Sequence, residues 1–88
     1  MTIEQVQALK VGDMVRYHDS TSDMETLEVV LSEWGKQKYK EIHMPNVTLQ
    51  TVAVMNEGNV GAYRDDRAQV GAEGWINEYN HDCFEKIA

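Results

Sequence analysis

The sequence predicts a single small, mainly β domain with a short N-terminal helix. Three observations indicate this class: a capping-box pattern opens the chain, apolar and polar residues alternate in several short segments, and glycines or polar runs separate those segments. A chain of 88 residues supports one core, because chains of this size bury only roughly 60 to 65% of their unfolded surface. We therefore expect one globular domain over residues 1–88.

The first residues have the pattern of one or two helical turns. Thr2 and Gln5 are spaced as a capping box, in which each side chain hydrogen-bonds to the backbone of the other residue. Ile3, Val6 and Leu9 then fall on one helical face. We expect this face to pack against the domain.

The next segment reads as a strand between two turns. Gly12 supplies the first turn, and residues 14–18 alternate with Val15 and Tyr17 on one face. Residues 19–23 contain no apolar side chain and mark a loop.

Residues 26–32 have two interpretations. As a strand they are rich in β-branched residues. That strand would place three aliphatic side chains inward: Leu27, Val29 and Leu31. As a helix over 22–34, the segment would begin with a second capping box, which gives an α+β alternative. We favour the strand, because consecutive valines and Gly35 weaken a helix.

Residues 47–55 form the best predicted strand. Their alternation slips near Thr51, which predicts a bulge, a sharp bend or burial on both faces. A bent central strand is what a small barrel requires. A hairpin loop over 56–59 should lead into a returning strand over 60–64.

The C-terminal part is again ambiguous. Residues 65–74 are rich in turn residues and are expected to form a loop. Residues 75–87 roughly fit a helix, the second form of the α+β alternative, but polar residues in their middle are poor helix formers. We favour a turn followed by a closing strand over 83–87. Trp75 is expected in the core, because small or apolar neighbours surround it.

Charge and composition limit the possible partners. Eight Lys and Arg stand against 15 Asp and Glu, a net charge of −7, and the acid excess is largest over 61–88. Nucleic acid is held largely through its phosphates, so this balance disfavours general nucleic-acid binding. The sequence has no signal-peptide pattern, no apolar run long enough for a bilayer and a single cysteine. We expect a cytoplasmic protein without a membrane role.

No catalytic, metal or cofactor site is expected. His81 and Cys83 lack the paired short spacings of a structural zinc site, and acidic neighbours disfavour a reactive thiolate. Asp65 and Asp66 are flanked by arginines, which suits a solvated loop better than acid–base chemistry.

One stretch, EWGKQKYKE over 33–41, gathers three of the eight basic residues beside two aromatics. It is interpreted first as a lysine-guarded sheet edge, second as a protein contact and third as a nucleic-acid contact. Together with Asp65 and Asp66, its partner-binding candidates are Trp34, Lys36, Lys38, Tyr39 and Lys40.

The opening LKVGDMVRY over 9–17 and the ending FEKI over 84–87 resemble small SH3-like barrels of the KOW kind. Such openings and endings also resemble small uncharacterised bacteriophage and prophage proteins. The resemblance implies an SH3-like barrel of about five strands and, for KOW proteins, contact with RNA or the ribosome. Here the loop over 19–24 is acidic, whereas nucleic-acid-binding members are usually basic in this loop.

These observations predict a non-enzymatic protein-interaction module. By its resemblance, it would be a small phage-type regulator or inhibitor that binds a host protein. An acidic C-terminal half suits a basic, nucleic-acid-handling partner. The alternative is a KOW-like nucleic-acid-binding module that uses residues 34–40. The oligomeric state stays open, because the sequence has no heptad or other self-association signature.

Overall fold

The computed structural model describes residues 1–35, 44–58 and 69–88. Its elements in chain order are α1 (Ile3–Gln7), β1 (Met14–His18), β2 (Glu25–Ser32), β3 (Val47–Asn56), β4 (Glu73–Ile76), the 3-10 helix η1 (His81–Cys83) and β5 (Phe84–Lys86). The described strands form one antiparallel sheet in the order β4-β3-β2-β1-β5. Strands β4 and β5 therefore lie at its two edges.

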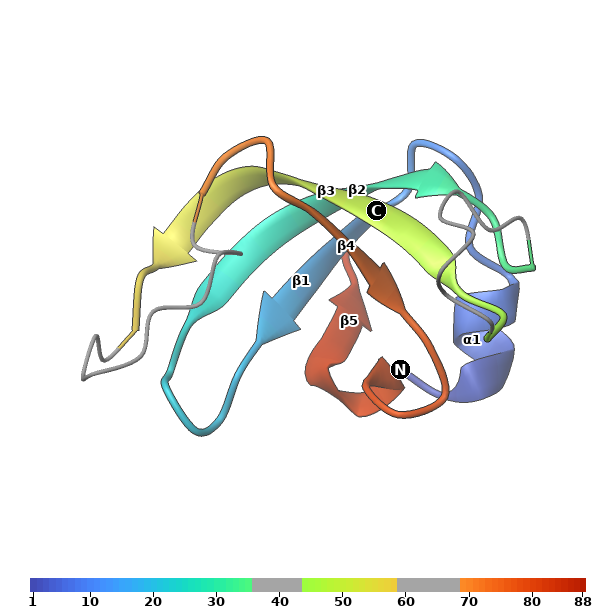
Figure 1. Cartoon of the computed structure of the whole chain (residues 1–88), viewed down its shortest axis with the longest axis horizontal. Helices are drawn as coiled ribbons and strands as arrows, with labels where there is room; N and C mark the ends of the chain where they lie inside the picture. The colour runs from blue at the N-terminus through green and yellow to red at the C-terminus, as the bar shows by residue number, and fades with distance from the viewer. Residues whose placement is uncertain (36–43, 59–68) are drawn as a thin grey trace.

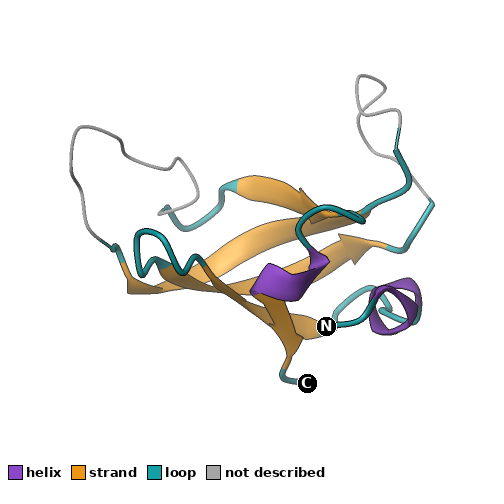
Figure 2. Ribbon diagram, turned by 90° about the horizontal axis from the view of Figure 1, so that it is seen from below, coloured by secondary structure: helices purple, strands orange, loops and turns teal. Residues whose placement is uncertain are grey.

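The sheet is curled into a half-barrel, which confirms the mainly β class and the short N-terminal helix. Figure 1 shows β2 and β3 arching over the molecule. Figures 1 and 2 place α1 and η1 on the concave side of this arch. The arrangement is compatible with a small SH3-like barrel.

Helix α1 begins as predicted. The Thr2 hydroxyl accepts a hydrogen bond from the Gln5 N–H at 3.2 Å, and the Gln5 side-chain oxygen accepts one from the Thr2 N–H at 2.8 Å. These bonds satisfy donors that a helix N-terminus otherwise leaves without partners. Val6 and Leu9 are buried, and Gly12 forms the following turn with a φ of 94°. The predicted turn is confirmed, and so is the helical face at Val6 and Leu9, whereas Ile3 of the same predicted face is only half-buried.

The core lies between the concave face of the sheet and α1. Its buried apolar side chains come from α1, the loops and the strands: Val6, Leu9, Val15, Tyr17, Met24, Val30, Val47, Leu49, Ile76 and Phe84. The rings of Tyr17 and Phe84 contact each other across β1 and β5, with centroids 5.0 Å apart and planes inclined by 49°. Since aromatic pairs favour such tilted contacts, this pair fixes β5 against β1.

The segment over 22–34 contains a strand, so the helical alternative there is wrong. Strand β2 pairs with β1 on one side and with β3 on the other. The connecting loop over 19–23 is confirmed; it closes when the Asp19 N–H donates to the Met24 carbonyl at 2.9 Å. Pairing on both sides satisfies the backbone of β2, and tertiary pairing of this kind overrides a helical pattern.

The predicted inner face of β2 is wrong. The core residues Val15 and Tyr17 of β1 pair with Glu28 and Thr26 of β2. Because directly paired residues project to the same face, Thr26, Glu28 and Val30 point inward, and each is at most 1% exposed. Leu27 and Val29, expected inside, lie half-buried on the outer face instead. Leu31, also expected inside, is half-buried at a position where the pairing with β3 shifts.

Strand β3 contains the irregularity predicted near Thr51. Its pairing with β2 shifts between Leu27 and Glu28, and this shift leaves Val52 without an opposite residue. A second shift precedes the end of β3. A third shift lies between Val30 and Ser32. Bulges bend a strand and increase its twist, so these three positions contribute to the curl of the half-barrel.

The fourth strand lies later in the chain than expected. Strand β4 covers Glu73–Ile76, so the prediction of a loop over 65–74 is wrong for its last two residues. It pairs with the first half of β3, from Val47 to Gln50. The returning strand predicted over 60–64 lies outside the described residues.

The segment over 75–87 is not one helix, so that alternative is also wrong. The chain turns after β4, where the Asn77 N–H donates to the Asn80 side chain at 2.8 Å. After one 3-10 turn in η1, β5 pairs with β1, and the predicted closing strand is confirmed. Trp75, expected in the core, is half-buried on the outer face, because its neighbour Ile76 takes the inward position of β4.

Candidate functional site

Trp34 is the one predicted contact residue within the described ranges. It follows β2, is half-buried and packs against the core cluster. The next residue, Gly35, donates its N–H to the Asn46 carbonyl at 3.3 Å, which holds this segment beside the start of β3. Part of the indole surface is therefore buried against the core. The other predicted contact residues lie outside the described residues: Lys36, Lys38, Tyr39, Lys40, Asp65 and Asp66.

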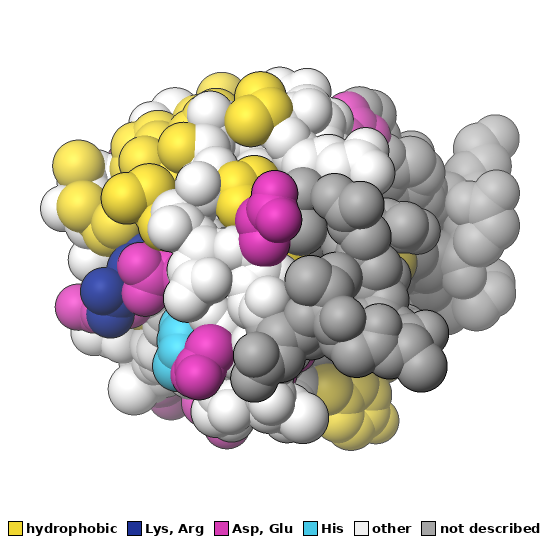
Figure 3. Space-filling model, turned by 90° about the vertical axis from the view of Figure 1, so that its left-hand side faces the viewer, with side chains coloured by type: hydrophobic (Ala, Val, Ile, Leu, Met, Phe, Trp, Pro, Cys, Tyr) yellow, Lys and Arg dark blue, Asp and Glu magenta, His cyan; other side chains and the backbone are white. Residues whose placement is uncertain are grey.

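The outer face of β2 and β3 carries an apolar surface that includes two residues predicted to lie in the interior, Leu27 and Val29. Leu27 pairs with Ala53, and Val29 lies two positions further along β2 on the same face. On β3, Val52 is 40% exposed and Met55 is 62% exposed. We refer to these five residues as the outer strip. Seen from the end of the sheet where β3 finishes, hydrophobic side chains gather on one side of the molecule (Figure 3).

The residues of the outer strip are partly exposed for a simple reason. A side chain in the middle of a sheet is flanked by neighbours on both sides, so even a solvent-facing Leu or Val loses much of its accessible surface. The half-burial of Leu27 and Val29 therefore does not require a covering layer. The run VAVM over 52–55, in which the alternation fails, was the available signal for this surface.

Charged side chains border the outer strip. Arg16 of β1 pairs with Leu27, so it lies on the same face. Its Nη2 is 2.9 Å from Glu85 Oε2, and its Nη1 is 3.7 Å from Glu25 Oε1. The guanidinium thus lies between a carboxylate of β2 and one of β5. Such surface pairs each contribute only about 0 to 1 kcal/mol, but they neutralise the cation.

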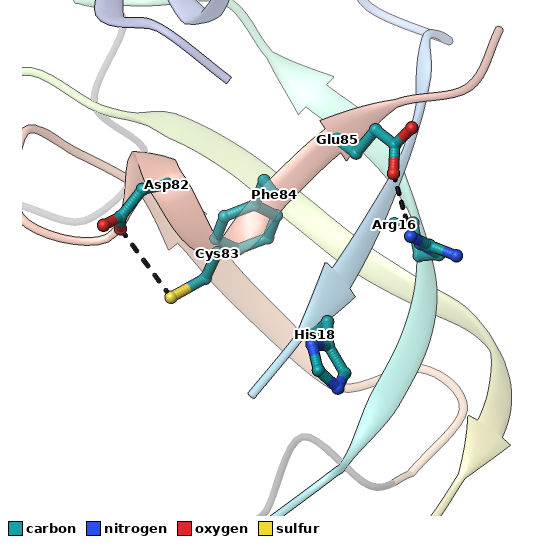
Figure 4. Close-up of a pocket in the computed structure, with 6 residues that line it drawn as sticks. All are labelled: Arg16, His18, Asp82, Cys83, Phe84 and Glu85. Carbon is teal, nitrogen blue, oxygen red and sulfur yellow. Dashed lines mark hydrogen bonds and ion pairs between the residues drawn. The ribbon is translucent and has the colours of Figure 1, made fainter. Parts of the chain in front are cut away.

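A surface pocket of about 190 Å³ lies beside β1 and β5. Its lining is shown in Figure 4: Arg16, His18, Asp82, Cys83, Phe84 and Glu85. The Cys83 thiol donates to Asp82 at 3.8 Å, and its sulfur is directed toward that carboxylate and away from His18. His18 lies 3.5 Å from Asp23 instead. A thiol beside a carboxylate is the opposite of the basic environment that activates a nucleophile.

Inside the half-barrel lies a carboxyl group. Glu28 is 1% exposed and sits on the core face between Val15 of β1 and Thr51 of β3. Its Oε1 accepts a 2.9 Å hydrogen bond from the Thr51 hydroxyl. Burial of a carboxyl costs free energy unless hydrogen bonds replace water, so Thr51 is a structural partner. The local pattern did not predict this pair, although Glu28 stands between the aliphatic residues Leu27 and Val29.

The described surface is strongly acidic. The described ranges hold twelve of the fifteen Asp and Glu residues, eleven of them outside the core because Glu28 is buried, but three of the eight Lys and Arg. Each of these three cations already contacts a carboxylate: Lys10 lies 3.1 Å from Glu33, Lys86 lies 3.7 Å from Asp13, and Arg16 has the two partners given above. Among the described residues, carboxylates therefore outnumber the Lys and Arg side chains that could neutralise them.

Comparison with known proteins assigns no family. No protein family, curated protein or solved structure matches this chain. Within the described ranges, no group of three or more His, Cys, Asp or Glu is placed to hold a metal ion. No helix in those ranges has the length and apolar character needed to cross a membrane. Function must therefore be inferred from the charge and geometry of the chain itself.

Proposed function

We propose that this chain is a non-enzymatic protein-interaction module, a small regulator or inhibitor, and that its partner is a basic protein. The observation that carries the proposal is the acid excess of the described surface, on which each Lys and Arg is already bound to a carboxylate. Such a surface attracts a basic partner and speeds its association. Proteins that handle nucleic acid have the required charge, and carboxylates here can take the place of phosphates.

The competing function is a KOW-like nucleic-acid-binding module that uses residues 34–40. Single-stranded nucleic acid is held by stacking on exposed aromatics and by cations that neutralise phosphates. The packing of Trp34 against the core reduces the indole surface open to a base. The acid excess adds long-range repulsion. Both observations favour the protein-binding function.

The test begins with capture of partners by the tagged chain from a nuclease-treated lysate of the source cells. A captured protein is then purified, and its affinity is measured by calorimetry at low and high salt. We expect a partner of positive net charge, with affinity that falls about tenfold or more as salt screens the contact. Neutralising Asp65 and Asp66 to Asn should weaken the complex, whereas changing Lys36, Lys38 and Lys40 to Ala should leave it intact.

A gel-shift assay with single-stranded RNA and DNA supplies the opposing outcome. Retardation at low salt that disappears in the triple lysine variant would overturn the proposal and support the nucleic-acid module.

A further inference from the structure

The outer strip is an apolar surface on the solvent-facing side of the sheet. Two of its residues, Leu27 and Val29, would be buried if β2 presented its other face to the core. The opposite parity of β2 would place Leu27 and Val29 in the core and would expose Glu28. The observed register does the reverse, at the cost of burying a carboxyl group. On the neighbouring strand, Val52 and Met55 are also exposed. Contiguous apolar surface of this kind marks contact sites on soluble proteins.

The charges around the outer strip are acidic. Glu25 is at the start of β2, two positions before Leu27 and on the same face, and Glu85 lies across from Arg16 at the β1 side of the strip. On the other side, Glu73 of β4 pairs with Gln50 of β3, which lies on the same face as Val29. Arg16 is the one Lys or Arg that the described strands place on this face, and it pairs with two of these glutamates, Glu25 and Glu85. Three carboxylates thus stand against one guanidinium, which leaves this border with a negative net charge. We refer to these three glutamates as the acidic rim.

This arrangement specifies the chemistry of an occupant. Aliphatic side chains would cover the outer strip, and Lys or Arg at the margins would meet the acidic rim. A second copy of this chain fits less well, because two copies facing each other through this surface would bring their acidic rims together. Like charges across an interface cost affinity.

We propose that the outer strip docks a basic amphipathic segment of the partner protein, with aliphatic residues on Leu27, Val29 and Ala53 and cations on the acidic rim. The inference rests on the proposed function and adds to it the surface and the chemistry of the segment bound.

The probe is a synthetic 14-residue peptide of Leu and Lys, with the Leu residues on one helical face. Two matched peptides serve as controls: one has the same residues in scrambled order, and one has Glu in place of Lys. Binding is followed by fluorescence anisotropy, and the site is mapped by amide shifts in ¹⁵N spectra of the full chain. We expect shifts concentrated in β2 and β3 with the amphipathic Leu/Lys peptide, weaker binding of the scrambled peptide and none of the Leu/Glu peptide.

Variants test the contact directly. Leu27→Ser and Met55→Ser should each weaken peptide binding, by about tenfold for Leu27→Ser at the centre of the strip. Met55 is 62% exposed, so its substitution keeps the test valid even if Leu27→Ser perturbs folding. Val11→Ser is the matched control, because Val11 is equally exposed but lies in the turn before β1. It should bind as the wild type does.

Four outcomes would overturn the inference. The surface would be rejected if no peptide bound at millimolar concentration, or if the amide shifts were confined to other elements. Capture of a basic partner would still support the proposed function separately. Equal binding of Leu27→Ser and wild type would also reject the surface. A concentration-dependent dimer in sedimentation that Leu27→Ser abolishes would assign the surface to a second copy of the chain.

Discussion

Thr51 donates its hydroxyl hydrogen to Glu28 inside the half-barrel, and the two oxygens are 2.9 Å apart. The bond links β3 to β2 across the core face, at a position where both residues are 1% exposed. Thr48, three residues earlier on the same strand, offers a contrast. Its hydroxyl is also buried, but it has no hydrogen-bond partner in the described part of the chain. Thr48 pairs with Trp75 on the outer face, so the two buried threonines of this strand differ in their surroundings as well as in this hydrogen bond.

Replacement of Thr51 by Val should lower the free energy of unfolding by about 1.5 to 3 kcal/mol, because a buried carboxyl loses a donor while the shape of the side chain is kept. Thr48→Val should change the unfolding free energy by less than about 1 kcal/mol, since no hydrogen bond is lost. Urea denaturation followed by tryptophan fluorescence measures both. Equal losses in the two variants would show that the Glu28 contact does not stabilise the fold.

Two adjacent valines of β2 test which face of the strand is inside. Val30 is 1% exposed in the core, whereas Val29 is on the outer face. Val30→Thr should destabilise the protein by about 1 to 3 kcal/mol, because it buries a hydroxyl without a partner. Val29→Thr should cost less than about 1 kcal/mol, since Thr suits an exposed strand position. The reverse order of the two unfolding free energies would contradict the assigned register.

Gly58 brings the end of β3 close to the loop between β1 and β2. A Cβ at this position would lie 2.5 Å from the Ser22 carbonyl oxygen and 2.9 Å from the Met24 nitrogen. Gly12 has a similar positive φ, but a Cβ there would have no neighbour within 4 Å. Both changes to Ala should carry the left-handed backbone cost of about 1 to 2 kcal/mol. Gly58→Ala should cost more in thermal unfolding, because backbone atoms must also move; an equal cost would indicate that this loop yields freely.

Trp34 and Tyr79 test the division between core and surface aromatics. Trp34 packs against the core, whereas Tyr79 is 77% exposed. Trp34→Ala should therefore cost about 2 kcal/mol of stability, somewhat less than for a fully buried Trp. Tyr79→Ala should stay within about 0.5 kcal/mol of the wild type. If chemical denaturation shows no loss for Trp34→Ala, the indole is free to serve as the contact that the sequence analysis expected.

The candidate site was predicted less well than the fold. Contact residues were predicted where aromatics and charges are adjacent in sequence: Trp34, the lysines and Tyr39 after it, and the aspartates at 65–66. Trp34 instead contributes to the core. The outer strip was missed because Leu27 and Val29 have the pattern of buried residues. Exposure of aliphatic side chains depends on the partner strands, which a local pattern does not contain.

The sequence by itself determined the local elements of this protein. The Thr2–Gln5 capping box, the Gly12 turn and the irregularity near Thr51 all formed where the pattern predicted them. Each depends on atoms within a few residues, or on the intrinsic conformational preferences of the residues concerned.

The tertiary structure alone decided which side of β2 faces the core. Successive side chains of a strand point to opposite faces, so a shift of one residue in the pairing exchanges the two sets completely. Val15 fixes the register by pairing with Glu28, which is thirteen positions later in the chain. That long-range pairing buried a carboxyl group beside Thr51 and left Leu27 and Val29 on the surface, where they are available to a partner.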